Sequence, residues 1–164
     1  MTSEFVHLHN HSDYSLLDGA QKIDQLVNTI DDLNMDAVAL TEHGNMFSVL
    51  PYYKQAKKAG IKPIIGCEIY VAVGSRFEKK TRSDGGWGNN HLILLAQNFT
   101  GYKNLMKLVT AGYLEGFYYR PRIDMDLLRE YSEGLICMSP CLKGVVPEKM
   151  LKGDYEGARK EALL

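Results

Sequence analysis

The sequence is poor in cysteine, and its charges nearly balance. Its 164 residues include 3 cysteines, Cys67, Cys137 and Cys141, an odd number whose spacing matches no zinc ribbon. We therefore expect reduced thiols and no disulfide framework. The 19 basic and 20 acidic residues give a net charge of −1, so no overall field attracts nucleic acid or a membrane. Any basic surface must be local.

Membrane-spanning and secretion signals are also missing. The longest apolar runs, such as residues 91–96, are far shorter than the roughly 20 residues that a spanning helix needs. Residues 1–4 do not begin the basic and then apolar pattern of a signal peptide. There are no repeats or linkers, and a hydrophobic content of 45% can fill a core. These features predict one soluble, cytoplasmic domain.

Short β-like runs alternate with segments of helical period, as in a βαβ chain. Gly60 is suited to end a helix over residues 47–59. An earlier helix has its apolar stripe at Ile23, Leu26, Val27, Ile30 and Leu33. Extended segments are predicted at residues 4–9, 37–41, 63–66, 69–73, 91–96 and 134–139. Further helices are predicted at residues 100–112, with Thr100 as the cap, at 124–131 and 145–151, and from Asp154 onward.

Three features bear on the architecture. Residues 91–96 are almost continuously apolar, which is typical of a strand buried on both faces of a parallel sheet. Residues 74–90 have little hydrophobic period and predict a long surface loop. The last helix reaches Leu163 and Leu164 with its apolar face open, so we expect the N-terminal part of a longer polypeptide. An α/β barrel and an open doubly wound sheet are the two candidate architectures.

Three of the five histidines lie two residues apart near the end of the first predicted strand, at His7, His9 and His11. In an extended segment their side chains would project to the same side. Neutral imidazoles bind divalent metals well, whereas clustering them as cations is costly. The run therefore predicts a metal site, and the alternative is a polar strand end with solvated histidines.

Other candidate ligands lie close to the ends of predicted strands, where catalytic groups collect in α/β barrels. They are Asp18, His43, Glu68, His91 and Cys141. Of these, only His91 lies at the start of its predicted strand. Singly, Asp18 could form an Asx turn, Glu68 a surface carboxylate and Cys141 a buried thiol. Together they favour Zn²⁺, Mn²⁺ or Fe²⁺ over Ca²⁺. The number of ligands indicates several ions, and adjacent metals suit the hydrolysis of a phosphoester.

Three stretches carry a resemblance to a known family. They are HLHNHSDYSLLDG, TEHGNMFSVLPYYKQAKKAGIKPIIGCEIYV and FYYRPRID. They resemble the polymerase and histidinol phosphatase (PHP) domain, in the form found at the N-terminus of bacterial replicative DNA polymerase III alpha subunits. The resemblance covers essentially the whole chain and implies an α/β fold, a distorted seven-stranded (β/α) barrel. It also implies that residues 1–164 are an incomplete PHP domain, whose final strands and Asp-x-His ligand pair follow Leu164.

The resemblance also implies roles for individual residues. Asp18, His43 and Glu68 would be catalytic, and His7 would be a strand residue beside the paired ligands. The implied cofactors are divalent metals, Zn or Mn or Fe, in up to a trinuclear cluster. The implied metal ligands are His9, His11, Asp18, His43, Glu68, His91 and Cys141.

Two stretches combine cations with aromatic rings, a mixture that can hold phosphates and stack the bases of single-stranded DNA. One is the loop with Arg76, Lys79, Lys80, Arg82 and Trp87, and the other is Tyr118, Tyr119, Arg120, Pro121 and Arg122. Solvated loops look the same, and FYYRPRID could instead pack within the domain. The resemblance implies as partners a DNA primer-template, the rest of the polymerase chain and other replisome subunits, with no membrane.

The leading hypothesis is a metal-dependent phosphoesterase acting as the 3′-to-5′ proofreading exonuclease of a DNA-directed DNA polymerase. DNA synthesis itself would belong to the rest of the polymerase. One alternative is a non-catalytic scaffold that is stabilised by its metals and docks a separate proofreading subunit. Another is a stand-alone phosphatase similar to histidinol phosphatase.

Overall fold

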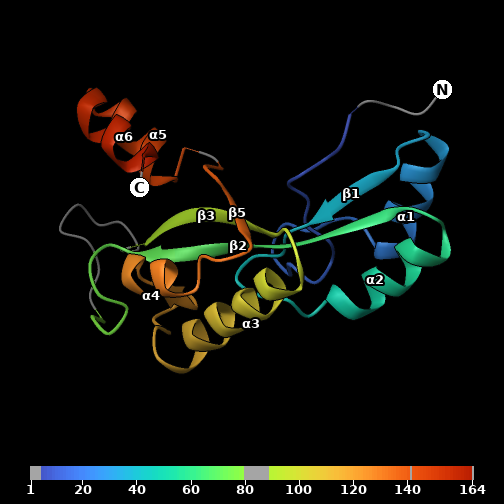
Figure 1. Cartoon of the computed structure of the whole chain (residues 1–164), viewed down its shortest axis with the longest axis horizontal. Coiled ribbons are helices and arrows are strands. Elements are labelled where there is room, and N and C mark those ends of the chain that lie inside the picture. The colour runs from blue at the N-terminus through green and yellow to red at the C-terminus, as the bar shows by residue number, and fades with distance from the viewer. Residues whose placement is uncertain (1–4, 80–88, 141, 164) are drawn as a thin grey trace.

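The chain folds as a mixed α/β domain, and the predicted class is confirmed (Figure 1). The computed structural model describes residues 5–79, 89–140 and 142–163. The strands are β1 (Ala37–Leu40), β2 (Lys62–Ala72), β3 (Asn89–Ala96), β4 (Arg122–Ile123) and β5 (Leu135–Met138). The helices are α1 (Ile23–Asp32), α2 (Val49–Lys58), α3 (Phe99–Leu114), α4 (Met125–Glu130), α5 (Val145–Leu151) and α6 (Tyr155–Ala162).

The five strands form one mixed sheet in the order β1-β2-β3-β5, with β4 also paired to β2. β1 and β4 run parallel to β2, but β3 is antiparallel to both β2 and β5. The prediction of a parallel environment for β3 is therefore wrong. A parallel crossover usually needs a helix, and residues 73–79, the described part of the β2–β3 connection, contain none. The closed seven-stranded barrel stays a prediction.

β2 is a single long strand where the sequence predicted two short ones. Gly66 interrupts the apolar pattern, but it does not end the strand. A Cβ at this position would lie 2.7 Å from the carbonyl oxygen of Leu94 and 2.8 Å from Cγ2 of Thr41. Glycine is therefore required here, because the backbone of Leu94 and the side chain of Thr41 approach this position closely. As a result Glu68 lies within a strand rather than after one.

The predicted first strand, residues 4–9, is not a regular strand in its described part. It runs beside β1 with backbone hydrogen bonds from Ala39 to His7 and from Thr41 to Asn10, of 2.8 and 2.9 Å. The side-chain amide of Asn10 donates to the carbonyl oxygen of Ala39 at 3.1 Å. The Asn10 side chain therefore donates to β1 where a backbone amide would donate in a regular β-ladder. The segment is held against the sheet without forming a strand.

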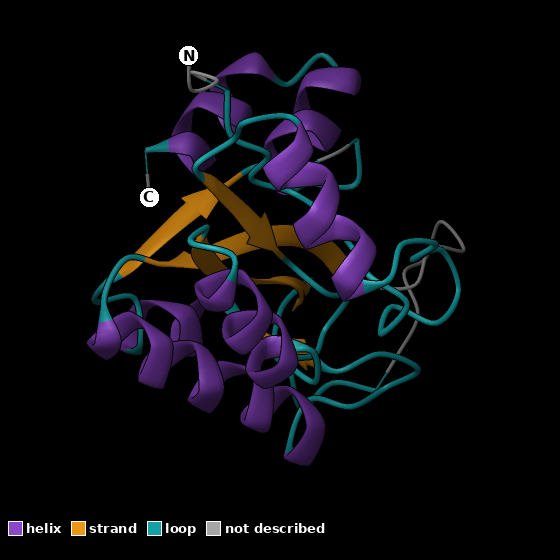
Figure 2. Cartoon of the chain, turned by 90° about the vertical axis from the view of Figure 1, so that its right-hand side faces the viewer, coloured by secondary structure: helices purple, strands orange, loops and turns teal. Residues whose placement is uncertain are grey.

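Alternation along β2 separates an apolar face from a polar one. Cys67, Ile69 and Val71 pack against α3 and α4, together with buried leucines of those helices. Glu68 and Tyr70 consequently point to the other face. Figure 2 shows helices on both sides of the sheet, and a separate core joins α1 and α2 to β1.

The predicted helices are present with small shifts at their ends. Gly60 has the expected positive φ, +78°, just beyond α2. α3 begins at Phe99, and its cap is Asn98, whose side chain accepts a hydrogen bond from the amide of Gly101, so the prediction of Thr100 as the cap is wrong. The short strand β4 was not predicted. No helix among the described residues is long and apolar enough to cross a membrane.

Candidate metal centre

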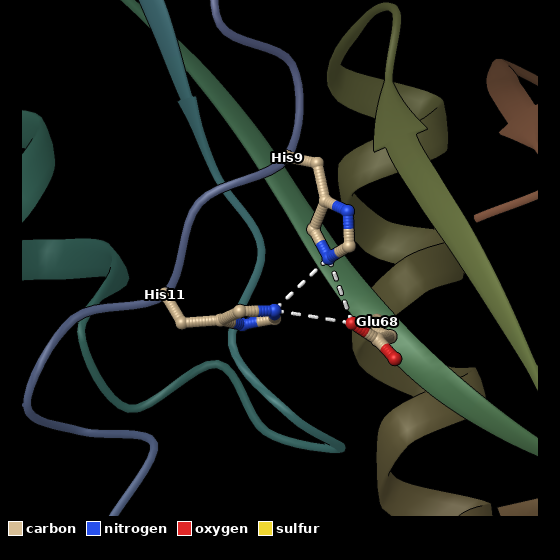
Figure 3. Close-up of side chains that lie close together, drawn as sticks. All are labelled: His9, His11 and Glu68. Atoms are coloured by element: carbon tan, nitrogen blue, oxygen red, sulfur yellow. Dashed lines mark hydrogen bonds and ion pairs between the residues drawn. The ribbon is translucent and has the colours of Figure 1, made fainter. Parts of the chain in front are cut away.

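Glu68 lies at the centre of a cluster of histidines (Figure 3). Its side chain is only 3% exposed, and Oε2 lies 2.8 Å from His9 Nε2 and 3.1 Å from His11 Nε2. The two imidazole nitrogens are 2.9 Å apart. Three potential ligand atoms from two distant parts of the chain therefore meet at one point.

Three further side chains extend the cluster. His91 Nδ1 lies 2.5 Å from Glu68 Oε1, and His43 Nδ1 lies 3.6 Å from Glu68 Oε2. His43 Nε2 also lies 2.9 Å from Asp18 Oδ2. The ring of His43 stacks on that of His11, with the centroids 4.0 Å apart. The described candidate ligands thus all lie in one cluster.

The structure gives a different outcome for two other residues of the sequence prediction. Cys141 lies outside the described residues. His7 packs its ring edge-on against Phe5, with the centroids 4.8 Å apart. The interpretation of three equivalent histidines is corrected for His7, because the chain does not continue as a regular strand through this segment and the residues two apart need not share a side.

The edge of β2 positions the cluster. β1 pairs with the first residues of β2, the bridge between His43 and Glu68 follows, and β4 pairs with Tyr70 and Val71. The amide of Glu68 donates to the carbonyl of Glu42, and the amide of Gly44 donates to the carbonyl of Glu68. His43 is thereby held beside Glu68 by backbone hydrogen bonds.

Glu42 is a buried residue of the site that sequence reasoning missed. It is 1% exposed and accepts hydrogen bonds from the amide and hydroxyl of Ser12 and from the hydroxyl of Ser15. The Ser15 oxygen in turn accepts from the amide of His43, at 3.1 Å. Glu42 therefore ties the turn after His11 to the segment that carries His43. The only indication of this role in the sequence is the position of Glu42 next to His43 in the stretch TEHG.

The electrostatics of the cluster follow from Glu68. Burial alone would raise the pKa of its carboxyl, but hydrogen bonds from His11 and His91 and the nearby charge of His43 lower that pKa well below its ordinary value. Burial opposes protonation of His11, yet its contact with Glu68 raises the pKa of His11 above the ordinary value of 6.5. The carboxylate is therefore the charged anchor of the cluster.

The donor set fits divalent metal ions. Nδ1 of His11 and Nδ1 of His43 are buried without a hydrogen-bond partner. A buried polar atom without a partner is costly, and a metal ion is one way to satisfy such a nitrogen. Imidazole nitrogens combined with carboxylate oxygens are typical of Zn²⁺, Mn²⁺ and Fe²⁺ sites. Metal ligation by each of these residues stays a prediction.

The basic residues that the sequence suggested as DNA contacts have different surroundings in the structure. Arg120 lies over the ring of Tyr70, 5.5 Å from its centroid, and borders the same cavity as His43. Arg122 is 1% exposed, and its guanidinium donates to the backbone carbonyls of Gly116 and Glu78, so here it supports packing of the domain. Lys79 donates to the carbonyl of Glu115 at 2.6 Å. Lys80, Arg82 and Trp87 lie outside the described residues.

Comparison with known families matches residues 7–163 to the PHP domain. The chain belongs to the PHP domain family. Among curated proteins, this PHP domain is 57% identical over 161 residues to DNA polymerase III subunit alpha of Borreliella burgdorferi. It is 51% identical over 158 residues to the same subunit of Treponema pallidum. The chain is covered to 98% and 96%, but it spans only 14% and 13% of these two relatives.

Solved structures give more distant likenesses. A two-domain protein from Bacteroides vulgatus, described as containing a predicted PHP-like metal-dependent phosphoesterase, has 19% sequence identity and a TM-score of 0.47, covering 80% of this chain and 33% of that one. An amidohydrolase from Chromobacterium violaceum has 20% identity and a TM-score of 0.46, covering 65% of this chain and 32% of that one.

Proposed function

We propose that this PHP domain is a metal-dependent phosphoesterase that removes nucleotides from the 3′ end of DNA, as the proofreading exonuclease of a polymerase chain. The observation that carries the proposal is the buried carboxylate of Glu68 surrounded by His9, His11 and His91, with His43 and Asp18 beside them. The names of the relatives support the polymerase context. On this proposal the domain is part of a longer chain whose remainder synthesises DNA.

The residues of the site would divide the work. Histidine nitrogens and the Glu68 carboxylate would hold the metal ions, which when bound polarise a phosphoryl oxygen and activate water. Asp18 is 58% exposed on the outer side of the cluster, so it can meet substrate from the solvent. Its carboxylate keeps His43 oriented through the contact at 2.9 Å. Arg120 brings a positive charge to the same cavity, where it can bind a phosphate.

The test uses the longer polypeptide that we propose contains this domain. We expect it to release nucleotides from a 3′-mispaired, end-labelled primer, and we expect a chelator to stop the release. Asp18→Asn should lower the rate at least about 100-fold, because loss of an orienting partner alone costs 10- to 100-fold. Asp31→Asn, on the exposed side of α1, is the matched control and should keep the full rate.

A second function is favoured by the way residues 5–18 are held. This segment forms no regular strand among the described residues, and His9 and His11 within it meet β2 at Glu68. Metals bound there would fasten the segment to the sheet and stabilise a scaffold without catalysis. No nucleotide release despite bound metal would support this scaffold, which would dock a separate proofreading subunit, and would contradict the exonuclease.

A further inference from the structure

The cavity beside the histidine cluster is lined by two chemically different kinds of side chain. Its volume is about 750 Å³, within the range of small-molecule sites. Its polar lining includes Asp18, His43 and His91, with the cations Arg120 and Lys143. Its lining also includes apolar and aromatic side chains, which the phosphoester chemistry does not use. They are Leu16, Leu17, Phe47 and Tyr113.

The apolar side chains that line the cavity are unusually open to solvent. Leu16 and Leu17 are 92% and 83% exposed, and Phe47 is 66% exposed. The rings of Phe47 and Tyr113 lie 6.4 Å apart at an angle of 44°. Exposed apolar groups that gather on a cavity indicate a ligand with an apolar or aromatic part.

Phe47 is held in place by its neighbour Asn45. The side-chain oxygen of Asn45 accepts a hydrogen bond from the amide of Phe47 at 3.1 Å, and its amide nitrogen donates to the carbonyl of His43 at 3.1 Å. Asn45 is 6% exposed. Both polar groups of the Asn45 side chain thus form hydrogen bonds with the backbone. Asn45 therefore positions Phe47 and does not read the edge of a base.

We propose that this cavity binds one unpaired nucleotide, with its phosphate at Arg120 and its base stacked against Phe47 and Tyr113. The inference rests on the proposed phosphoesterase function and names its substrate class. Stacking on an aromatic ring accepts every base, because each base has a π-face. A base that is paired in a duplex is stacked between its neighbours and cannot make this contact. The site therefore selects frayed or mispaired 3′ ends without regard to sequence.

The experiment measures binding of dTMP and of 2-deoxyribose 5-phosphate, which lacks a base, to the 164-residue chain by calorimetry in the presence of Mn²⁺. We expect dTMP to bind at least about tenfold more tightly, the effect of one base–aromatic stack. Phe47→Ala and Phe47→Leu should both remove this preference and leave the affinity for 2-deoxyribose 5-phosphate unchanged. Arg120→Ala should weaken both ligands by the same factor.

Phe99→Ala is the matched control, because Phe99 is also exposed, 71%, and stacks on Tyr102 instead of bordering the cavity. It should change neither affinity. Equal affinity of the unaltered chain for the two ligands, or a preference that survives in both Phe47 variants, would overturn the inference. A clear preference for dTMP in a chain whose parent polypeptide releases no nucleotide would support the inference while contradicting the phosphoesterase.

Discussion

At the scale of single residues, Glu68 organises the site. Among the described residues, it is the one buried carboxylate that contacts the clustered imidazoles. Its charge is expensive to bury, and the histidines offset that cost only when they share a proton or a metal ion with it. The opposite pKa shifts of Glu68 and His11 follow from this pairing. They make the stability of the metal-free domain depend on pH.

We predict that the metal-free domain is most stable between about pH 4.5 and pH 6.5. The pKa of Glu68 is lowered from its ordinary value of 4.5, so the stability it contributes is present above pH 4.5 and is lost at lower pH. The pKa of His11 is raised from 6.5, so its contribution is present below pH 6.5 and is lost as the pH rises through the higher folded value. Urea denaturation with chelator from pH 4 to pH 8 measures this profile.

Glu68→Gln should flatten the profile and lower the free energy of unfolding by about 3 kcal/mol at pH 5.5, because it removes one partner of a buried pair. Glu156→Gln, at an exposed position of α6, is the control and should leave the profile unchanged. A stability of the unaltered domain that rises steadily from pH 5 to pH 8 would contradict the prediction.

At the scale of elements, local sequence signals located most helices, but the pairing of strands was decided by distant contacts. The apolar stripe of α1 and the glycine after α2 depend only on neighbouring residues, and both were predicted correctly. The direction of β3 depends on its partners β2 and β5, and the prediction was wrong. The start of α3 also differs, because Asn98 caps it in place of Thr100.

We predict that Asn98→Ala lowers the free energy of unfolding by about 1 kcal/mol. Its side chain accepts the hydrogen bond from the amide of Gly101, which would otherwise lack a partner at the first turn of α3. Thr100→Ala is the matched control two residues along and should have almost no effect. Urea denaturation of the two variants checks the difference, and a larger loss from Thr100→Ala would contradict the assignment of the cap.

At the scale of the whole molecule, the cluster joins parts of the chain that are far apart. His9 and His11 precede β1, His43 follows it, Glu68 lies on β2 and His91 on β3. A metal ion that these side chains hold would link the N-terminal segment to the sheet. Ligand binding to the folded state alone raises its stability by mass action.

We predict that Mn²⁺ at about 100 times its dissociation constant raises the melting temperature by about 5–10 °C. This range corresponds to about 2.7 kcal/mol of binding linkage in a domain of this size. His9→Ala should reduce the rise, whereas His7→Ala should not, because His7 packs on Phe5 away from Glu68. Calorimetric melting with Mn²⁺ and with chelator measures both variants. An equal rise in the two variants would contradict the ligand role of His9.

The sequence by itself determined the α/β class, most helices and the residue types of the site, because periodicity, caps and metal-binding side chains are local properties of the chain. It also carried the PHP motifs, which the family comparison bears out. Tertiary structure alone decided that Glu68 stands inside one long strand, that Arg122 is buried and that Glu42 supports the histidines. These outcomes depend on which surfaces meet after folding, and a pattern of neighbouring residues does not contain that information.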